Sequence, residues 1–235
     1  MQTVPITVII PVYNEVSTIR KVIERVVTSL TSLAEIIVVD DGSNDGTVEI
    51  LKVIQSETSV RVLFQPENQG KTSAVIRGLA EAKGTWAVVQ DADLEYDPND
   101  IKVLFEKAKL NPHAAIYGRR PGCWHMPSRW IFAVGVLFID IAIFAFYRRC
   151  IRDHATCYKL VPREMLNSFT LESTGFEGCI EITAKLMRSG IPIIQIPITY
   201  APRGVHEGKK LTVGYGPRAL AAVWKYRSWK KRVGE

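Results

Sequence analysis

The chain has 235 residues, of which 47% are hydrophobic and 23% charged, and it carries a formal net charge of +6. This composition is ordinary for a globular protein and excludes the collagen, coiled-coil and disordered classes. No pair of its four cysteines has the CxxC spacing of zinc ribbons or thioredoxin-type redox sites. The basic charge comes without a zinc finger or an aromatic RNA-binding motif, so we expect no nucleic-acid partner.

The first half alternates short β-branched runs with amphipathic helical patterns. We predict, in chain order, a strand over 6–10, a helix over 17–30, a strand over 35–39, a helix over 45–56, a strand over 60–64, a helix over 72–83, a strand over 86–90 and a helix over 100–110. This alternation predicts an α/β fold with a central, mostly parallel, twisted sheet and helices on both faces. Ligands of such sheets bind beyond the carboxyl ends of the strands, which here means 11–15, 40–45 and 91–95.

The second half is less regular. Its apolar run over 130–147 contains Asp140 and falls just short of the roughly 20 residues of a membrane-spanning helix, so we predict a buried or interfacial helix. Further predictions are a helix over 177–189, a β-rich stretch over 191–199, a charged loop over 200–210 and a basic helix over 218–233. Aromatic and basic residues alternate over 224–232, which favours contact with an anionic membrane surface. No low-complexity linker separates the halves, so we expect one domain over 1–235.

Two aspartates, Asp91 and Asp93, directly follow the predicted strand over 86–90. Carboxylates one residue apart can point into the same cleft when the chain turns there, and such oxygens suit Mg²⁺ or Mn²⁺ that also binds substrate phosphates. Glu95 could supply a further oxygen. The alternative is a solvated acidic turn ahead of the next helix.

Another acidic pair, Asp40 and Asp41, ends the predicted strand over 35–39. These carboxylates can accept hydrogen bonds from a nucleobase or a ribose, or they can belong to an ordinary turn before a helix. Lys71 lies in a Gly-Lys-Thr sequence like the end of a P-loop, but Gln65 stands where that motif requires glycine, so we reject a P-loop. Whether Lys71 meets a phosphate or is a surface lysine stays open.

Clustered cations in the second half could bind phosphate. Arg120, Arg129 and the segment 203–210 supply them, and guanidinium groups bind phosphate oxygens in pairs. Glu177 and Glu181 are one helical turn apart, so either could be a general base for a hydroxyl acceptor, or both could be solvated acids of an amphipathic helix.

Taken together, these motifs resemble the family 2 glycosyltransferases, in particular the dolichol-phosphate mannose synthase-like branch. The matching segments are 9–15 (IIPVYNE), 38–43 (VVDDGS), 68–71 (NQGK) and 90–95 (QDADLE), followed by 153–159, 176–182 and 203–211. The likeness covers nearly the whole chain. One departure is Thr72, where relatives often carry glycine.

The resemblance implies the GT-A (nucleotide-diphospho-sugar transferase) fold, with a donor-binding lobe over 1–118 and an acceptor-binding lobe over 119–235. For the donor it implies contacts from Pro11, Tyr13, Glu15, Asp40, Asp41, Lys71, Asp91, Ala92 and Asp93. For the metal it implies Asp91, Asp93 and Glu95, and for catalysis Asp91, Asp93, Arg120 and Arg203. For the acceptor it implies Arg120, Arg129, Asp153, Glu177 and Lys209.

The expected function is therefore that of a metal-dependent inverting glycosyltransferase with a GDP- or UDP-sugar donor. We favour a polyprenyl phosphate acceptor, because basic and apolar surfaces coincide in the second half. We expect the protein to be cytoplasmic and peripheral on the inner face of the membrane. The alternatives are transfer to a sugar hydroxyl, for which Glu177 or Asp153 would be the base, a nucleotidyltransferase, and a non-catalytic binding module.

Overall fold

The computed structural model describes residues 4–121, 130–203 and 215–231. Its strands are β1 (Ile6–Val12), β2 (Ala34–Asp40), β3 (Arg61–Phe64), β4 (Trp86–Val89), β5 (Ala115–Arg119), β6 (Lys159–Pro162) and β7 (Ile193–Pro197). Its helices are α1 (Ile19–Ser29), α2 (Thr47–Glu57), α3 (Lys71–Glu81), α4 (Asn99–Lys109), α5 (Trp130–Tyr147), α6 (Arg163–Asn167), α7 (Gly178–Arg188) and α8 (Tyr215–Tyr226).

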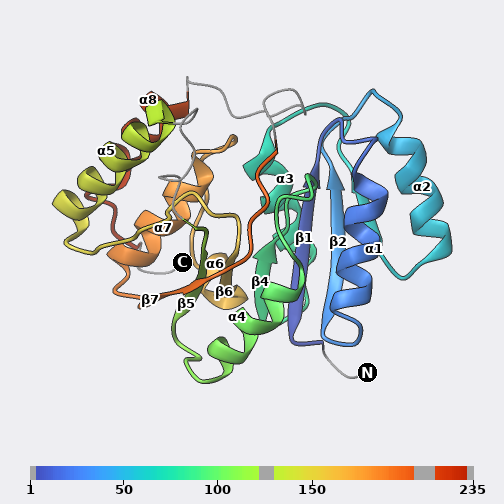
Figure 1. Ribbon diagram of the computed structural model, residues 1–235, viewed down its shortest axis with the longest axis horizontal. Coiled ribbons are helices and arrows are strands. Elements are labelled where there is room, and N and C mark those ends of the chain that lie inside the picture. The colour runs from blue at the N-terminus through green and yellow to red at the C-terminus, as the bar shows by residue number, and fades with distance from the viewer. Residues whose placement is uncertain (1–3, 122–129, 204–214, 232–235) are drawn as a thin grey trace.

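All seven strands form one sheet in the order β3-β2-β1-β4-β6-β5-β7. Neighbouring strands are parallel except at β6, which is antiparallel to both β4 and β5. Val12 of β1 pairs with Asp40 of β2, and Ile9 of β1 pairs with Val89 of β4, so the carboxyl ends of these three strands meet at one edge (Figure 1). The predicted mostly parallel sheet is confirmed.

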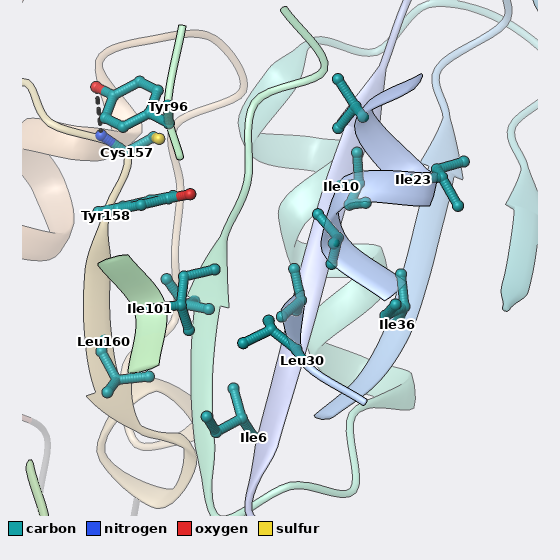
Figure 2. Packing of buried hydrophobic residues seen from close by; sticks show 14 of the residues in the cluster. Ile6, Ile10, Ile23, Leu30, Ile36, Tyr96, Ile101, Cys157, Tyr158 and Leu160 are labelled. Atoms are coloured by element: carbon teal, nitrogen blue, oxygen red, sulfur yellow. Dashed lines mark hydrogen bonds between the residues drawn. The ribbon is translucent and has the colours of Figure 1, made fainter. Parts of the chain in front are cut away.

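Helices cover both faces of the sheet because successive side chains of its strands point to opposite sides. In β1, Ile6, Val8 and Ile10 pack with residues of α1, α2 and α4, whereas Ile9 packs with residues of α3, α6 and α7. Figure 2 shows the first of these cores, in which Ile10 and Ile23 lie between β1 and α1. The continuous apolar runs of the first half are thus strands buried on both faces.

A third layer lies at the far side of α7, where α5 and α8 pack together (Figure 1). Ile139 and Ile143 of α5 are buried against α7 and α8, whereas Phe138 and Ile141 are exposed. Asp140 is only partly exposed, with 27% of its side chain accessible. Among the described residues, no helix combines the length and apolarity needed to cross a membrane.

Four elements differ from the sequence-based expectation: the short helix α6, in a stretch where no helix was predicted, and the three described next. The strands β5 and β6 were not predicted, because each is only four or five residues long and has no turn signal of its own. The terminal helix α8 begins at Tyr215 and ends at Tyr226, earlier at both ends than the basic pattern over 218–233 indicated. Since the sheet joins strands from both halves, the proposed division into lobes at residue 118 is not a break in the backbone architecture.

Candidate functional site

Asp91 and Asp93 lie just beyond the carboxyl end of β4, where the chain turns sharply. The turn is made by Leu94, whose φ of 62° is left-handed. Asp91 Oδ1 forms an ion pair with Lys71 Nζ at 2.5 Å. Although burial alone would lower the pKa of Lys71, the charge of Asp91 raises it above its ordinary value. The lysine predicted to be either a phosphate contact or a surface residue therefore belongs to the acidic site.

Asp93 is the least compensated of these acids. Its burial and the charges of Asp91 and Glu95 raise the pKa of Asp93 to about 7. Burial is the largest cause of this shift, and the like charges of Asp91 and Glu95 add to it. Such a carboxylate pair fits a divalent cation, which would relieve the repulsion.

Glu95 is turned away from this pair toward a later segment. Its Oε2 accepts a hydrogen bond from the Tyr200 hydroxyl at 2.6 Å, and its Oε1 accepts one from the Arg203 amide at 2.8 Å. Among the described residues, no three histidine, cysteine, aspartate or glutamate side chains come together as a metal-ligand set. Asp91 and Asp93 would therefore be the protein's ligands, and Mg²⁺ or Mn²⁺ commonly completes such a shell with substrate phosphates and water.

The carboxyl end of β2 presents Asp40 and Asp41, and the two are used differently. Both oxygens of the buried Asp41 accept internal hydrogen bonds, from the Gln65 side chain and from the amides of Gln69 and Gly70. Asp41 thus fixes the loop that leads into α3. Asp40 is equally buried, but within the described residues its Oδ1 has no hydrogen-bond partner. An unsatisfied buried carboxylate oxygen is costly, so a donor group on a ligand would satisfy it.

Glu15 follows β1 and connects the first strand to the acidic turn. Its Oε2 forms an ion pair with Arg203 Nη2 at 3.1 Å and accepts a hydrogen bond from the Thr18 hydroxyl. Thr18 also donates to the Ala92 carbonyl, and Arg203 Nε donates to the Asp93 carbonyl at 2.6 Å. Glu15, Ala92, Asp93 and Arg203 are therefore brought together. Pro11 lies near the end of β1, paired with Val39 of β2, and Tyr13 directly follows β1 and is partly exposed.

The amino end of α3 meets the segment before α7. Gly70 has φ 97°, and a Cβ on it would lie 2.6 Å from the Thr174 carbonyl oxygen, so only glycine fits. Thr72 donates from its hydroxyl to the Gly175 carbonyl and lies against Gly178, where a Cβ would collide with it. Thr72, where the resemblance to family 2 glycosyltransferases leads us to expect glycine, joins the two halves of the chain through these contacts.

Arg120 and Asp153 form a two-point pair, which we call the clamp. Arg120 Nε and Nη2 donate to the two carboxylate oxygens of Asp153 at 2.9 and 2.7 Å, and the Arg120 amide donates as well. Burial alone would raise the pKa of Asp153, but the Arg120 hydrogen bonds and charge lower it. The Arg120 guanidinium also lies over the Tyr200 ring, 5.0 Å from its centroid. Asp153 is accordingly ionised, and both of its oxygens already accept hydrogen bonds from Arg120, which disfavours it as a general base.

Other predicted residues lie at the margins of the site. Glu177 immediately precedes α7, and its Oε1 accepts a hydrogen bond from the Gly175 amide at 3.1 Å. Arg129 and Lys209 lie outside the described residues. Glu181, weighed as an alternative base, is fully buried in an ion pair with Lys185 at 2.6 Å and so has a structural role.

Residues that the sequence analysis did not single out support the acidic turn from beneath. The buried Gln90 donates to the Asp91 carbonyl and accepts from the Tyr158 hydroxyl. Tyr96 stacks on Tyr158 and accepts a hydrogen bond from the Cys157 amide (Figure 2). A polar Gln90 at the end of the apolar run over 86–90 was the available signal, whereas the tyrosines come from separate parts of the chain.

A parallel sheet with acidic residues beyond β2 and β4 and an antiparallel strand next to β4 defines a GT-A-type sugar-nucleotide fold. Crystal structures bear this out: 95% of the chain superimposes on glucosyl-3-phosphoglycerate synthase from Mycobacterium tuberculosis, determined with Mn²⁺, UDP-glucose and phosphoglyceric acid, with a TM-score of 0.71 over 79% of that chain and 20% identity. The chain belongs to glycosyl transferase family 2, whose profile matches residues 7–166. The predicted fold and family are both confirmed.

Two curated relatives extend the likeness to most of the chain. A dolichol-phosphate mannosyltransferase of Pyrococcus furiosus is 32% identical over 87% of this chain, and one of Saccharomyces cerevisiae is 29% identical over 86%. The chain spans 58% of the length of the archaeal relative and 80% of that of the yeast relative.

Proposed function

We propose that the protein is a metal-dependent inverting glycosyltransferase that moves a sugar from a nucleoside-diphosphate donor to a polyprenyl phosphate at the cytoplasmic face of a membrane. The observation that carries the proposal is the juxtaposition of an undercompensated carboxylate pair, Asp91 and Asp93, with the cations Lys71 and Arg203. A site with both carboxylates and cations can bind a metal diphosphate without a large excess of either charge.

On the donor side, Asp91 and Asp93 would hold Mg²⁺ or Mn²⁺, which neutralises the diphosphate and makes it a better leaving group. Lys71 and Arg203 lie next to these acids and would bind diphosphate oxygens. The unpartnered oxygen of Asp40 would accept from the base or ribose, with Pro11 and Tyr13 beside it, while Asp41 keeps the loop over 65–70 in place.

On the acceptor side, the clamp favours a phosphate over a hydroxyl. A phosphate monoester is already an anion, so it can attack the anomeric carbon without a general base, from the face opposite the leaving group. Arg120 would exchange part of its bond to Asp153 for the acceptor phosphate, and Arg129 and Lys209 would add charge. A hydroxyl acceptor would need a free base, and of the two candidates only Glu177 is not held by an arginine.

The α5–α8 layer supports docking on a membrane. Its exposed apolar side chains, which we call the docking face, are Leu137, Phe138, Ile141 and Phe144 of α5 and Leu220 and Trp224 of α8. Leu137, Ile141 and Phe144 are spaced to share one side of α5. Exposed basic residues follow these helices in the chain, Arg148 and Arg152 after α5 and Lys230 after α8. Exposed apolar side chains together with basic residues are typical of proteins that bind anionic lipid surfaces.

The relatives agree with these assignments. Two are named for a dolichol-phosphate acceptor, and a third, from Aeromonas hydrophila, for an undecaprenyl-phosphate acceptor. The structural neighbour was crystallised with Mn²⁺ and UDP-glucose. These names support a nucleotide sugar, a divalent cation and a polyprenyl phosphate for this chain.

The test is a screen of GDP- and UDP-sugars with Mn²⁺, with and without a polyprenyl phosphate. We expect release of a nucleoside diphosphate and a lipid-linked sugar, both dependent on the lipid. Release of pyrophosphate would identify a nucleotidyltransferase, and transfer only to a free glycan would favour the hydroxyl acceptor. Binding of a donor without turnover of any acceptor would indicate a non-catalytic module.

A further inference from the structure

The second half contains a polar pair, one member buried and the other partly exposed, that the proposed reaction does not use. Asp140, in the middle of α5, places its Oδ1 2.8 Å from Nδ1 of His154. His154 is fully buried, and within the described part of the chain its Nε2 has no hydrogen-bond partner. A carboxylate only accepts, so the bond places a proton on Nδ1. Buried polar pairs add little net stability but do fix geometry, so this pair calls for a positional role.

His154 belongs to a short segment, 151–157, that is held at three points. Asp140 of α5 binds it from the outer layer, and Lys159 of β6 donates to the carbonyls of His154 and Thr156 from the sheet. The third point is Asp153, the neighbour of His154, which holds Arg120 in the clamp. The side chains of Asp153 and His154 therefore join the same stretch of backbone to the site and to α5.

The contacts continue from the clamp to the acidic turn. Arg120 lies over the ring of Tyr200, and the Tyr200 hydroxyl donates to Glu95. An unbroken series of packed and hydrogen-bonded groups thus connects α5, which carries most of the docking face, with the end of β4. Such a series is the physical requirement for coupling between two places, and measured coupling is what establishes it.

We propose that Asp140 and His154 are positioning residues that transmit the seating of α5 on a lipid surface to the clamp, so that Arg120 takes a membrane-borne phosphate in productive geometry. This inference rests on the proposed function for its acceptor and its docking surface. In this proposal α5 has two roles: it binds the lipid surface, and it sets the position of the clamp relative to the membrane.

The experiment compares one variant with two acceptors. The double substitution Asp140→Leu/His154→Phe removes the bond without leaving an unpaired polar group. We expect it to lower kcat/KM about tenfold for a polyprenyl phosphate in vesicles of phosphatidylcholine and phosphatidylglycerol, and less than about twofold for water-soluble geranyl phosphate without vesicles. Asp140→Asn keeps an oxygen acceptor for Nδ1 and should retain most of the activity on vesicles. Glu172→Gln, which breaks the exposed Glu172–Lys225 ion pair to α8, is the matched control and should leave both values unchanged.

Equal losses with the two acceptors would show that the pair only supports the fold of the clamp, and unchanged values would show that it has no role; either result overturns the inference. Hydrogen exchange provides a readout that needs no turnover. Vesicles should slow exchange in α5 and in 151–157 of the wild type, but only in α5 of the double variant. If vesicles do not change the exchange rates of the 151–157 amides in the wild type, the coupling is refuted. If vesicles slow this exchange but the wild type transfers no sugar, only the proposed function is refuted.

Discussion

The donor side and the docking layer of this molecule are specified in different ways. Around β1, β2 and β4, the site residues follow directly from parallel strands whose ends coincide, and short internal hydrogen bonds fix the loops that carry them. The layer of α5 and α8 instead presents apolar side chains outward, and α5 is connected to the site by the segment over 151–157 that follows it and by the side-chain contact of Asp140 with His154. Backbone topology determines where the donor-side residues lie. The docking layer is instead defined by the apolar side chains of α5 and α8 that no other part of the described chain covers.

This difference predicts which substitutions should change turnover and which should change binding to a lipid surface. Changes among the strand-end carboxylates should remove turnover without affecting lipid binding. Changes on the docking face should do the reverse, and the clamp, which touches both regions, should affect the use of the acceptor.

Of the substitutions on the donor side, we expect Asp93→Asn to lower the rate of sugar transfer most. The change keeps the size of the side chain but removes one of the two charges that would hold the cation, so we expect sugar transfer to fall about a thousandfold. The measurement is kcat/KM with Mn²⁺ and the preferred donor, alongside a circular dichroism spectrum that should be unchanged. Glu106→Gln removes one exposed charge from α4 and should retain full activity. Full activity in Asp93→Asn would refute the metal assignment.

The same residue predicts a pH dependence of stability. The pKa of Asp93 is raised to about 7 in the folded protein from an ordinary 3.8, so between these values the folded state holds a proton that the unfolded chain has lost. The free energy of unfolding contributed by this group therefore falls as pH rises from about 4 to about 7, and then levels off. Without divalent ions, urea unfolding should show a decrease roughly 4 kcal/mol larger in the wild type than in Asp93→Asn. Parallel curves would contradict the shift.

The Rossmann-like first half was predictable from sequence because its strands are apolar on both faces and its turns are marked. The spacing of Asp91 and Asp93 after such a strand was enough to place them at the carboxyl edge. Lys71 could be found but not assigned, because its partner Asp91 lies 20 residues away across a crossover helix. The partners of Glu95 could not be predicted, since nothing local in the sequence shows that Tyr200 binds it.

The second half was harder to predict for physical reasons. β6 runs against β4 and β5 and is only four residues long, so no periodic pattern identifies it. The pairing of Arg120 with Asp153 depends on that strand bringing two distant segments together. The sequence identified both residues through family resemblance, but only the fold shows that they hold each other and that Asp153 is a poor base.

Arg120→Lys tests the role of the clamp, which lies between the donor side and the docking layer. A lysine keeps the charge but loses the two-pronged contact with Asp153 and with a phosphate. We expect KM for the polyprenyl phosphate to rise about thirtyfold while KM for the donor changes little. Arg61→Lys disturbs a comparable pair with Glu81 at the far edge of the sheet and should change neither constant. An equal rise in both constants would place Arg120 on the donor side instead.

The docking face can be weakened without touching the site. Phe138 and Phe144 are 61% and 53% exposed on α5, so replacing both by serine should leave the fold intact. Each loses part of the roughly 2 kcal/mol that burying a phenylalanine provides, and we expect binding to anionic vesicles to fall about tenfold. Flotation with vesicles measures this, with Leu110→Ser, an exposed apolar residue at the end of α4, as the control. Unchanged flotation would show that these helices do not meet the lipid.

The smallest expected effect concerns the place where the two halves touch. Thr72 donates its buried hydroxyl to the Gly175 carbonyl, which lies just before α7. Thr72→Val keeps the shape but leaves that carbonyl without this donor, so the free energy of unfolding should fall by about 1 kcal/mol. Thr85→Val removes an exposed hydroxyl that binds the Pro5 carbonyl and should cost much less, because water can replace it. Urea unfolding of both variants decides the matter: equal losses would mean that the contact between α3 and the segment before α7 depends on apolar packing rather than on this hydrogen bond.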